Sequence, residues 1–257
     1  MYFDTHAHYD DRRFDGDRDE LLASMPENGV SLIVNPGCSA RSSKKALELA
    51  EKYPFVYAAV GVHPSDVPQM KDADLDTVKR LAGHEKAVAI GEIGLDYHYD
   101  FSPPEAQKKR FYEQLELARE LGMPVIVHDR DAHRDCLDIV SAFRGLRGVY
   151  HCYSGSLETA REILRLGWYL SFTGTLTYKN ARHAPDVVRY MPADRLMIET
   201  DAPYLTPEPY RRDRNDSRYV GIVCREAARI KRMSVEDMAA LTLKNGREFF
   251  GIQAAGG

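Results

Sequence analysis

Two histidines near the start of the chain, His6 and His8, follow a short apolar run and are separated by a single alanine. Side chains of a β-strand alternate between its two faces, so residues i and i+2 point to the same side. Both imidazoles would therefore leave one face of a strand end, within reach of one metal ion. An H-x-H pair is a weak signal by itself, so its meaning depends on whether other segments bring further ligands to the same place.

Residues of the metal-binding types also follow five other apolar runs. They are His63, Glu92, His128, His151, and the neighbouring acids Glu199 and Asp201. Imidazole and carboxylate ligands together suit transition metals and are a poor match for calcium. Their number exceeds what one tetrahedral ion needs, which predicts two ions roughly 3.5–4 Å apart. The expected cofactors are two divalent metal ions, drawn from Zn, Mn, Mg, Ni, Co or Fe.

The carboxylates in this set have distinguishable expected roles. Glu92 is the expected bridging ligand, because Gly91 and Gly94 flank it and leave room for tight turns. Asp201 could ligate a metal and take a proton from the attacking water, or it could cap the turn that follows. Glu199 shares the face of Asp201 but lies deeper, so we expect it to support the site or the fold.

Two further residues are candidates for contact with a substrate. His63 precedes a proline, which favours an extended backbone, and it could contact a phosphate or only form hydrogen bonds within the site. Arg130 comes two residues after His128 and is placed to bind an anion. The alternative for Arg130 is an ion pair with Asp129 or Asp131.

The elements that must position these residues alternate regularly along the chain. Eight short apolar runs predict strands at residues 2–5, 32–34, 56–60, 88–90, 125–127, 149–150, 169–172 and 196–198. Helical patterns lie between and after them, at residues 19–27, 39–53, 74–82, 103–121, 132–143, 157–166, 181–190, 218–231 and 235–250. This order predicts a single α/β domain over residues 1–257, a (β/α)8 TIM barrel. A doubly wound open sheet is the main alternative, although no glycine-rich nucleotide fingerprint follows the first run.

The helix expected over residues 103–121 has the clearest boundaries. Ser102 is a suitable N-cap, and Pro103 falls at the first helical position. Gly122 is placed to end the helix.

The bulk composition excludes some classes of protein. The 257 residues carry a formal net charge of -4, which argues against coating nucleic acid or an anionic membrane by bulk electrostatics. The four cysteines form no C-x-x-C pair, and no secretory signal or membrane-spanning apolar run is visible. We expect a cytoplasmic protein with no obligate protein partner, whose chain starts at the closed end of the barrel.

The ordered motifs resemble those of the TatD family of metal-dependent hydrolases, which are amidohydrolase-like barrels. The matching segments are DTHAH (4–8), GVHP (61–64), GEIGLDY (91–97), PVIVHDRDAH (124–133), HCYSG (151–155), ETDAPYLTP (199–207) and RN (214–215). They span essentially the whole chain. Singly these motifs are weak, but in this order they are highly specific.

The resemblance implies a two-metal hydrolase with assigned ligands. One metal would be held by His6, His8 and Asp201, the other by His128 and His151, and Glu92 would bridge them. Asp201 would also act as general base toward a bridging hydroxide. Members are described as deoxyribonucleases that act 3′→5′, so DNA, as single strands or 3′ ends, is the implied partner and substrate. His63, Arg130, Arg214 and Asn215 would then contact its phosphates.

Two departures from the family pattern and two other readings remain open. Asp129 stands where the family often has serine, and His98 where it often has an aromatic residue. The alternative activity is hydrolysis of esters, amides or small phosphoesters, as by a deacylase, and a barrel that only binds is a third hypothesis. For a nuclease, Tyr97, Tyr153, Tyr178 and Tyr204 could stack on bases, or could pack ordinarily at the rim.

Overall fold

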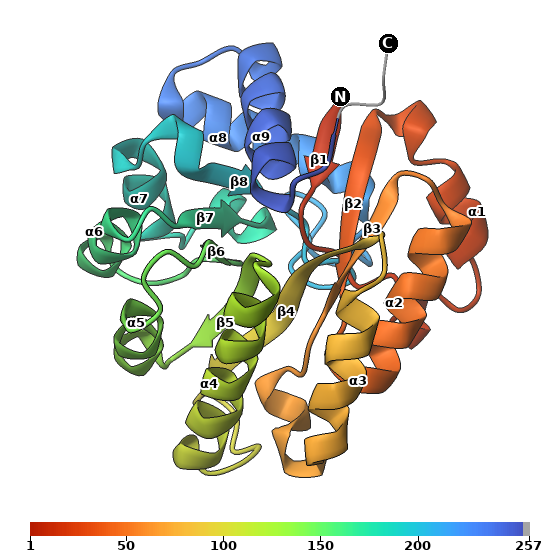
Figure 1. Ribbon diagram of the computed structural model, residues 1–257. Coiled ribbons are helices and arrows are strands. Elements are labelled where there is room, and N and C mark those ends of the chain that lie inside the picture. The colour runs from red at the N-terminus through yellow and green to blue at the C-terminus, as the bar shows by residue number, and fades with distance from the viewer. Residues whose placement is uncertain (254–257) are drawn as a thin grey trace.

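A computed structural model describes residues 1–253 and places eight parallel strands in one sheet, in the order β1 to β8 (Figure 1). The strands are β1 Tyr2–Asp4, β2 Val30–Pro36, β3 Val56–Val60, β4 Ala87–Asp96, β5 Val125–Arg130, β6 Gly148–Tyr150, β7 Tyr169–Phe172 and β8 Leu196–Ile198. Neighbours along the chain pair with each other throughout, as in a (β/α)8 barrel. The predicted fold class is confirmed, and the open doubly wound sheet is wrong.

Backbone hydrogen bonds join the first and last strands at their carboxyl ends. His8 N donates to Ala202 O at 2.7 Å, and Asp201 N donates to His6 O at 2.9 Å. Ala7 and Ala202 form an isolated parallel bridge between these two hydrogen bonds. These bonds bring the two ends of the sheet together where the predicted ligands lie.

The helices cover the outside of the strands (Figure 1). They are α1 Arg18–Ala23, α2 Ala40–Lys52, α3 Asp72–Ala82, α4 Pro104–Leu121, α5 His133–Ser141, α6 Leu157–Arg165, α7 Ala184–Tyr190, α8 Val220–Lys231 and α9 Val235–Phe250. The predicted start of α4 is wrong by one residue. Pro103, with an extended φ and ψ of -54° and 140°, is the N-cap in place of Ser102. Because Pro104 follows it, Pro103 is held out of the helical region, and the helix begins only at Pro104.

Alternate residues of the strands fill the barrel interior together with the end of α9. The Phe3 and Phe250 rings lie 5.8 Å apart, and the Tyr169 and Phe249 rings lie 5.2 Å apart. A Cβ at position 246 would lie 2.6 Å from the Phe3 ring, so only Gly246 allows α9 to approach β1 this closely. The carboxyl end of α9 packs against the amino-terminal side of the barrel. The predicted ligands lie on the opposite side.

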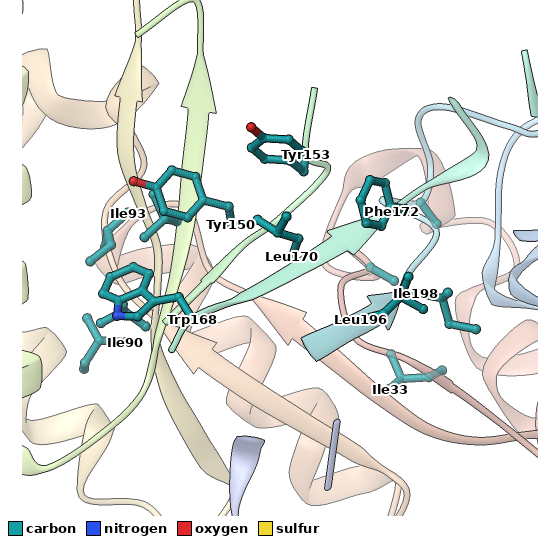
Figure 2. Close-up of a cluster of buried hydrophobic side chains, with 14 of the residues drawn as sticks. Ile33, Ile90, Ile93, Tyr150, Tyr153, Trp168, Leu170, Phe172, Leu196 and Ile198 are labelled. Carbon is teal, nitrogen blue, oxygen red and sulfur yellow. The ribbon is translucent and has the colours of Figure 1, made fainter. Parts of the chain in front are cut away.

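The opposite faces of the strands pack against the helices. Figure 2 shows Tyr150 and Trp168 beside Ile90 and Ile93, and the Tyr150 and Trp168 ring centres are 5.9 Å apart. A Cβ on Gly148 would lie 2.2 Å from the Trp168 ring. This packing fixes β6, and with it the residue that follows, His151.

Met1 is exposed and precedes β1, whereas His6 and His8 follow it. None of the described helices is long and apolar enough to cross a membrane.

Candidate metal centre

Glu92 lies at the centre of the predicted ligands. Its side chain is 3% exposed, and its two oxygens face different pairs of histidines. Oε2 lies 3.4 Å from His6 Nε2 and 3.6 Å from His8 Nε2. Oε1 lies 2.8 Å from both His128 Nδ1 and His151 Nε2. One carboxylate therefore connects two separate imidazole pairs.

The first pair is completed by Asp201. The His6 and His8 Nε2 atoms are 3.1 Å apart, and Asp201 Oδ1 lies 3.6 Å from the former and 3.4 Å from the latter. Two nitrogens that bind one tetrahedral zinc at about 2.0–2.1 Å lie roughly 3.3 Å from each other. The spacing of these side chains matches that expected around one ion.

The second pair has similar spacing. His128 Nδ1 and His151 Nε2 are 3.2 Å apart, on either side of Glu92 Oε1. The His6 and His151 rings stack at 4.0 Å with an interplanar angle of 9°, so the two pairs are in direct contact. Two stacked imidazolium ions would repel each other, so at least one of the two rings is kept neutral.

The two carboxylates of the cluster and His6 have the protonation states that metal ligands need. Burial raises the pKa of Glu92, but attraction to His151, His63 and His6 outweighs burial and holds that pKa well below its usual value. The pKa of Asp201 is lowered in the same way, against the effect of burial, by its hydrogen bond from His8. Burial lowers the pKa of His6. Two carboxylates and at least one neutral imidazole thus share one buried place.

The family model for TatD-related DNases matches residues 3–251. The chain belongs to the TatD family. Its relatives include the uncharacterised metal-dependent hydrolase YabD of Bacillus subtilis, which is 43% identical over 98% of this chain and 100% of the relative. The 3′-5′ ssDNA/RNA exonuclease TatD of Escherichia fergusonii is 34% identical over 97% of this chain and 99% of its own.

Solved structures agree with the sequence comparison. The crystal structure of YjjV, a TatD homologue of Escherichia coli, superposes with a TM-score of 0.93, at 31% identity and with 98% of each chain covered. The phosphotriesterase homology protein of E. coli shares the fold, with a TM-score of 0.68 at 16% identity over 97% of this chain and 98% of its own. The predicted family and the class of metal-dependent hydrolase are confirmed.

In this TatD protein His63 faces the second imidazole pair as a donor. Its Nδ1 accepts a hydrogen bond from Ser65 N at 3.1 Å, so in the neutral ring Nε2 carries the proton. That Nε2 lies 3.6 Å from Glu92 Oε1. Burial, reinforced by His128, lowers the pKa of His63 to about 3, so the ring is neutral. His63 is therefore arranged to donate to an oxygen, although it also lies close enough to Glu92 and His128 to share an ion with them.

The role expected for the glycines beside Glu92 is wrong, because β4 does not end at residue 90 but continues to Asp96. A Cβ on Gly91 would lie 2.8 Å from Ile126 Cβ, and one on Gly94 would lie 2.0 Å from His128 O. The two glycines let β4 approach β5 closely. They serve strand packing, not tight turns.

Asp96 is a site residue that the sequence reasoning missed. Its Oδ2 lies 3.1 Å from His128 Nε2, on the far side of the ring from Glu92. Asp96 is four residues after Glu92 on the same strand, so the two side chains point to the same face. The even spacing of the two acids is the sequence signal that could have identified Asp96 as a site residue. The contact fixes the His128 tautomer that leaves Nδ1 free to bind a metal.

Replacement of Asp96 by Asn is expected to weaken binding of the ion at His128 and His151 by about 10- to 100-fold, because the amide no longer favours the required tautomer. Any ion held by His6 and His8 should bind as in the wild type. Calorimetric titration with Zn or Mn measures both affinities, and Asp100→Asn in the exposed loop nearby is the control. Equal losses at both sites would contradict this role.

Glu199 supports His151 from below. Its Oε1 lies 3.5 Å from His151 Nδ1 and accepts a hydrogen bond from Cys152 N at 2.6 Å, while Oε2 accepts one from Ser171 Oγ at 2.6 Å. With 1% of its surface exposed, Glu199 lies deeper than Asp201.

Asp4 supports the first imidazole pair, His6 and His8, and the sequence reasoning missed it as well. It accepts hydrogen bonds from Thr200 N at 2.9 Å, Thr200 Oγ1 at 2.6 Å and Ser217 Oγ at 2.6 Å. These bonds tie β1 to the segment that carries Asp201. Burial raises the pKa of Asp4 to about 7. No ligand spacing marks this residue, since its partners are about 200 positions away.

Metal binding at pH 7 is expected to release protons. Burial lowers the pKa of His8 and of His151, but Cys38 and Asp201 for the former and Glu92 for the latter outweigh it, so both pKa values rise well above the ordinary value. A metal must displace these protons, so its affinity should rise about tenfold per pH unit for each proton lost. Calorimetry in buffers of different ionisation enthalpy counts the protons. A binding heat independent of the buffer would contradict this expectation.

The residues expected to contact phosphates differ in whether their side chains already bind other groups of the protein. Arg130 is exposed at the end of β5 and forms no ion pair within residues 1–253, so the alternative pairing with Asp129 or Asp131 is not seen. Asp129 binds His133 Nδ1 at 2.8 Å, and Asp131 binds His98 Nδ1 at 2.9 Å. Asp129 and His98, the two departures from the family pattern, are thus each part of a local pair of an acid and a histidine.

Arg214 and Asn215 hold the loop after β8. Arg214 binds both oxygens of Asp17, at 2.8 and 2.5 Å. Asn215 is completely buried, and its amide donates to Thr200 O at 2.9 Å and Tyr204 O at 2.5 Å. In this structure neither side chain is directed toward a substrate.

The four tyrosines considered for base stacking differ in how exposed their rings are. Tyr153 is 4% exposed and donates to Ser156 O, so it packs inside. Tyr97 donates a hydrogen bond to Asp135, and Tyr178 donates one to Thr206 O. Both rings are partly buried. Tyr204 is 46% exposed, with its ring centre 6.4 Å from that of His8, and is available at the site.

Proposed function

We propose that this TatD protein is a two-metal phosphodiesterase that removes nucleotides from the 3′ ends of single-stranded DNA. The observation that carries the two-metal part is the division of the Glu92 oxygens between two imidazole pairs, each with nitrogens spaced for one ion. The name of the E. fergusonii relative, a 3′-5′ ssDNA/RNA exonuclease, supports the substrate.

The ligands would be distributed over two ions. His6, His8 and Asp201 would hold one, and His128 and His151 would hold the other, with Glu92 between them. Bound divalent ions would supply Lewis acidity, which lowers the pKa of an attacking water and polarises a phosphoryl oxygen. The protein contributes their spacing, their ligands and the groups around them.

Asp201 would accept the proton of the attacking water. Its side chain is 14% exposed, in contrast to the 3% exposed Glu92, so it is the carboxylate of the cluster that solvent reaches. Its lowered pKa keeps it ionised at neutral pH. An ionised, accessible carboxylate beside His6 and His8 is suited to general base catalysis.

His63 and Arg130 would bind phosphates of the substrate strand. His63 carries its proton on Nε2, toward Glu92, and can donate it to an anionic oxygen. Arg130 offers a guanidinium with no competing carboxylate in the described chain. Arg214 and Asn215, which we expected in this role, would act indirectly by holding the loop that carries Tyr204.

The test is digestion of a 5′-labelled single-stranded oligonucleotide by the metal-loaded protein. A ladder that shortens from the 3′ end, and that disappears with chelator or with a blocked 3′ end, is the expected result. Circular single-stranded DNA should resist. A panel of model esters, amides and small phosphoesters tests the alternative activity. Hydrolysis of that panel, with no cleavage of DNA under any of the candidate metals, would overturn the proposal.

A further inference from the structure

An aromatic cluster with one arginine lies at the rim of the site beside β4 and β5. The Arg130 guanidinium lies 4.8 Å above the Tyr99 ring centre, and Tyr99 lies 5.2 Å from Phe101. Tyr99 is 48% exposed and Phe101 is 37% exposed. We refer to these three residues as the rim cluster. Large aromatic surfaces left in solvent beside a cation are the features that bind single-stranded nucleic acid.

The charges around the rim cluster leave Arg130 as its available cation. Its two acidic neighbours along the chain, Asp129 and Asp131, each bind a histidine, His133 and His98. Each acid is therefore engaged locally and does not pair with Arg130 within residues 1–253. An arginine over an aromatic ring can bind a phosphate while the ring stacks on the adjoining base.

The rim cluster is attached directly to the metal centre. Asp96 Oδ1 accepts hydrogen bonds from His98 N at 3.0 Å and Tyr99 N at 3.2 Å, while Asp96 Oδ2 contacts His128 Nε2 at 3.1 Å. One carboxylate therefore fixes both the ligand His128 and the backbone that carries Tyr99. The rim cluster has a set position relative to the second imidazole pair.

A comparable pair lies beside the first imidazole pair. Tyr204, 46% exposed, has the Arg13 guanidinium 3.9 Å from its ring centre and lies 6.4 Å from the His8 ring. An exposed Arg–Tyr pair thus also lies beside the first imidazole pair, but there the guanidinium is bound to both oxygens of Asp11, at 3.0 and 2.9 Å.

We propose that Tyr99, Phe101 and Arg130 form a nucleotide subsite that binds the part of a single strand beyond the scissile phosphate. The proposal rests on the proposed nuclease function. Tyr99 and Phe101 stack on a base, and Arg130 binds a phosphate. The subsite adds affinity only for strands long enough to reach it, so it makes binding depend on length. Stacking on one aromatic side chain changes affinity by about tenfold.

The chain offers a matched control for ordinary surface packing. Tyr190 is 51% exposed, and the Arg161 guanidinium lies 4.9 Å from its ring centre. Tyr190 ends α7, which leads into β8, so Tyr190 lies on the side of the barrel away from the metal centre, and Arg161 reaches its ring from α6. The local chemistry of this pair is the same as that of Tyr99 and Arg130, and its location differs.

The experiment measures binding of fluorescein-labelled oligonucleotides of two, four and eight nucleotides, as DNA and as RNA, by fluorescence anisotropy. All proteins carry Asp201→Asn, to prevent digestion, and the candidate metal. We expect Kd to tighten with length in this background and in its Tyr190→Leu derivative. Tyr99→Leu should weaken binding of the eight-nucleotide strand about tenfold and flatten the dependence on length. General damage to the fold would instead weaken all lengths alike.

A second variant separates the phosphate contact from stacking. Arg130→Gln should reduce the slope of log Kd against log salt by about 0.7, the value for one phosphate on a single strand. Tyr99→Leu should leave that slope as it is in the parent.

The outcomes distinguish the subsite from the function on which it rests. If the parent binds strands more tightly with length but Tyr99→Leu behaves as Tyr190→Leu does, the subsite is overturned and the nuclease proposal stands. If the wild type neither binds nor cleaves any oligonucleotide of either sugar, the nuclease proposal fails and the subsite fails with it.

Discussion

Asp201→Asn is expected to lower kcat by at least about 100-fold while the protein stays folded. The amide has nearly the same shape, but it cannot accept the proton of the attacking water, and general bases contribute roughly 100- to 10,000-fold. It also removes a negative charge beside His6 and His8, whose Nε2 atoms lie 3.6 and 3.4 Å from Asp201 Oδ1. The kinetics of oligonucleotide digestion measure the loss, and circular dichroism checks the fold.

The control for Asp201 is Asp213→Asn, an exposed residue of the same long loop. It should digest DNA as the wild type does. Equal rates for Asp201→Asn and the wild type, with each preparation free of contaminating nuclease, would show that Asp201 is not the base.

Glu92→Gln is expected to abolish binding of the ions as a pair. Glu92 is buried between four imidazoles, and an uncharged amide there offers one weak oxygen in place of two charged ones. In the wild type, an ion at 100 times its Kd stabilises the folded state by about 2.7 kcal/mol, or roughly 5–10 °C in Tm for a chain of this size. Scanning calorimetry with added Zn or Mn should show that shift for the wild type and little or none for the variant.

Glu92→Asp distinguishes the effect of the negative charge from the effect of side-chain length, because it keeps the carboxylate and shortens the side chain. It should retain one ion and lose the second. Two ions bound to Glu92→Gln with the affinity of the wild type would mean that this carboxylate is not a ligand.

The barrel could be predicted because its signal is local and repeated. Each strand is a short apolar run followed by a helical pattern, and the polar residues follow the runs where barrel mouths form. The same reasoning brought His6, His128 and Asp201 to one place, although His6 is more than a hundred positions from each of the other two. Apolar periodicity indicates which residues are buried, and both the strands and the helices of the barrel have buried apolar faces. The pattern therefore predicts both kinds of element.

The length of β4 could not be predicted because glycines carry no periodic signal. Gly91 and Gly94 resemble turn residues in the sequence, but the close approach of β5 is what requires them. The same limit applies to partners. Nothing in the sequence shows that Arg214 binds Asp17 or that Thr200 binds Asp4, since these contacts exist only once the chain has closed the barrel.

The central claim is that Glu92 joins two metal ions, and anomalous diffraction from crystals grown with Zn or Mn tests it most directly. We expect two peaks about 3.5–4 Å apart, one near His6 and His8 and the other near His128 and His151, with one Glu92 oxygen toward each. A single peak, or a second peak out of reach of Glu92, would contradict the account.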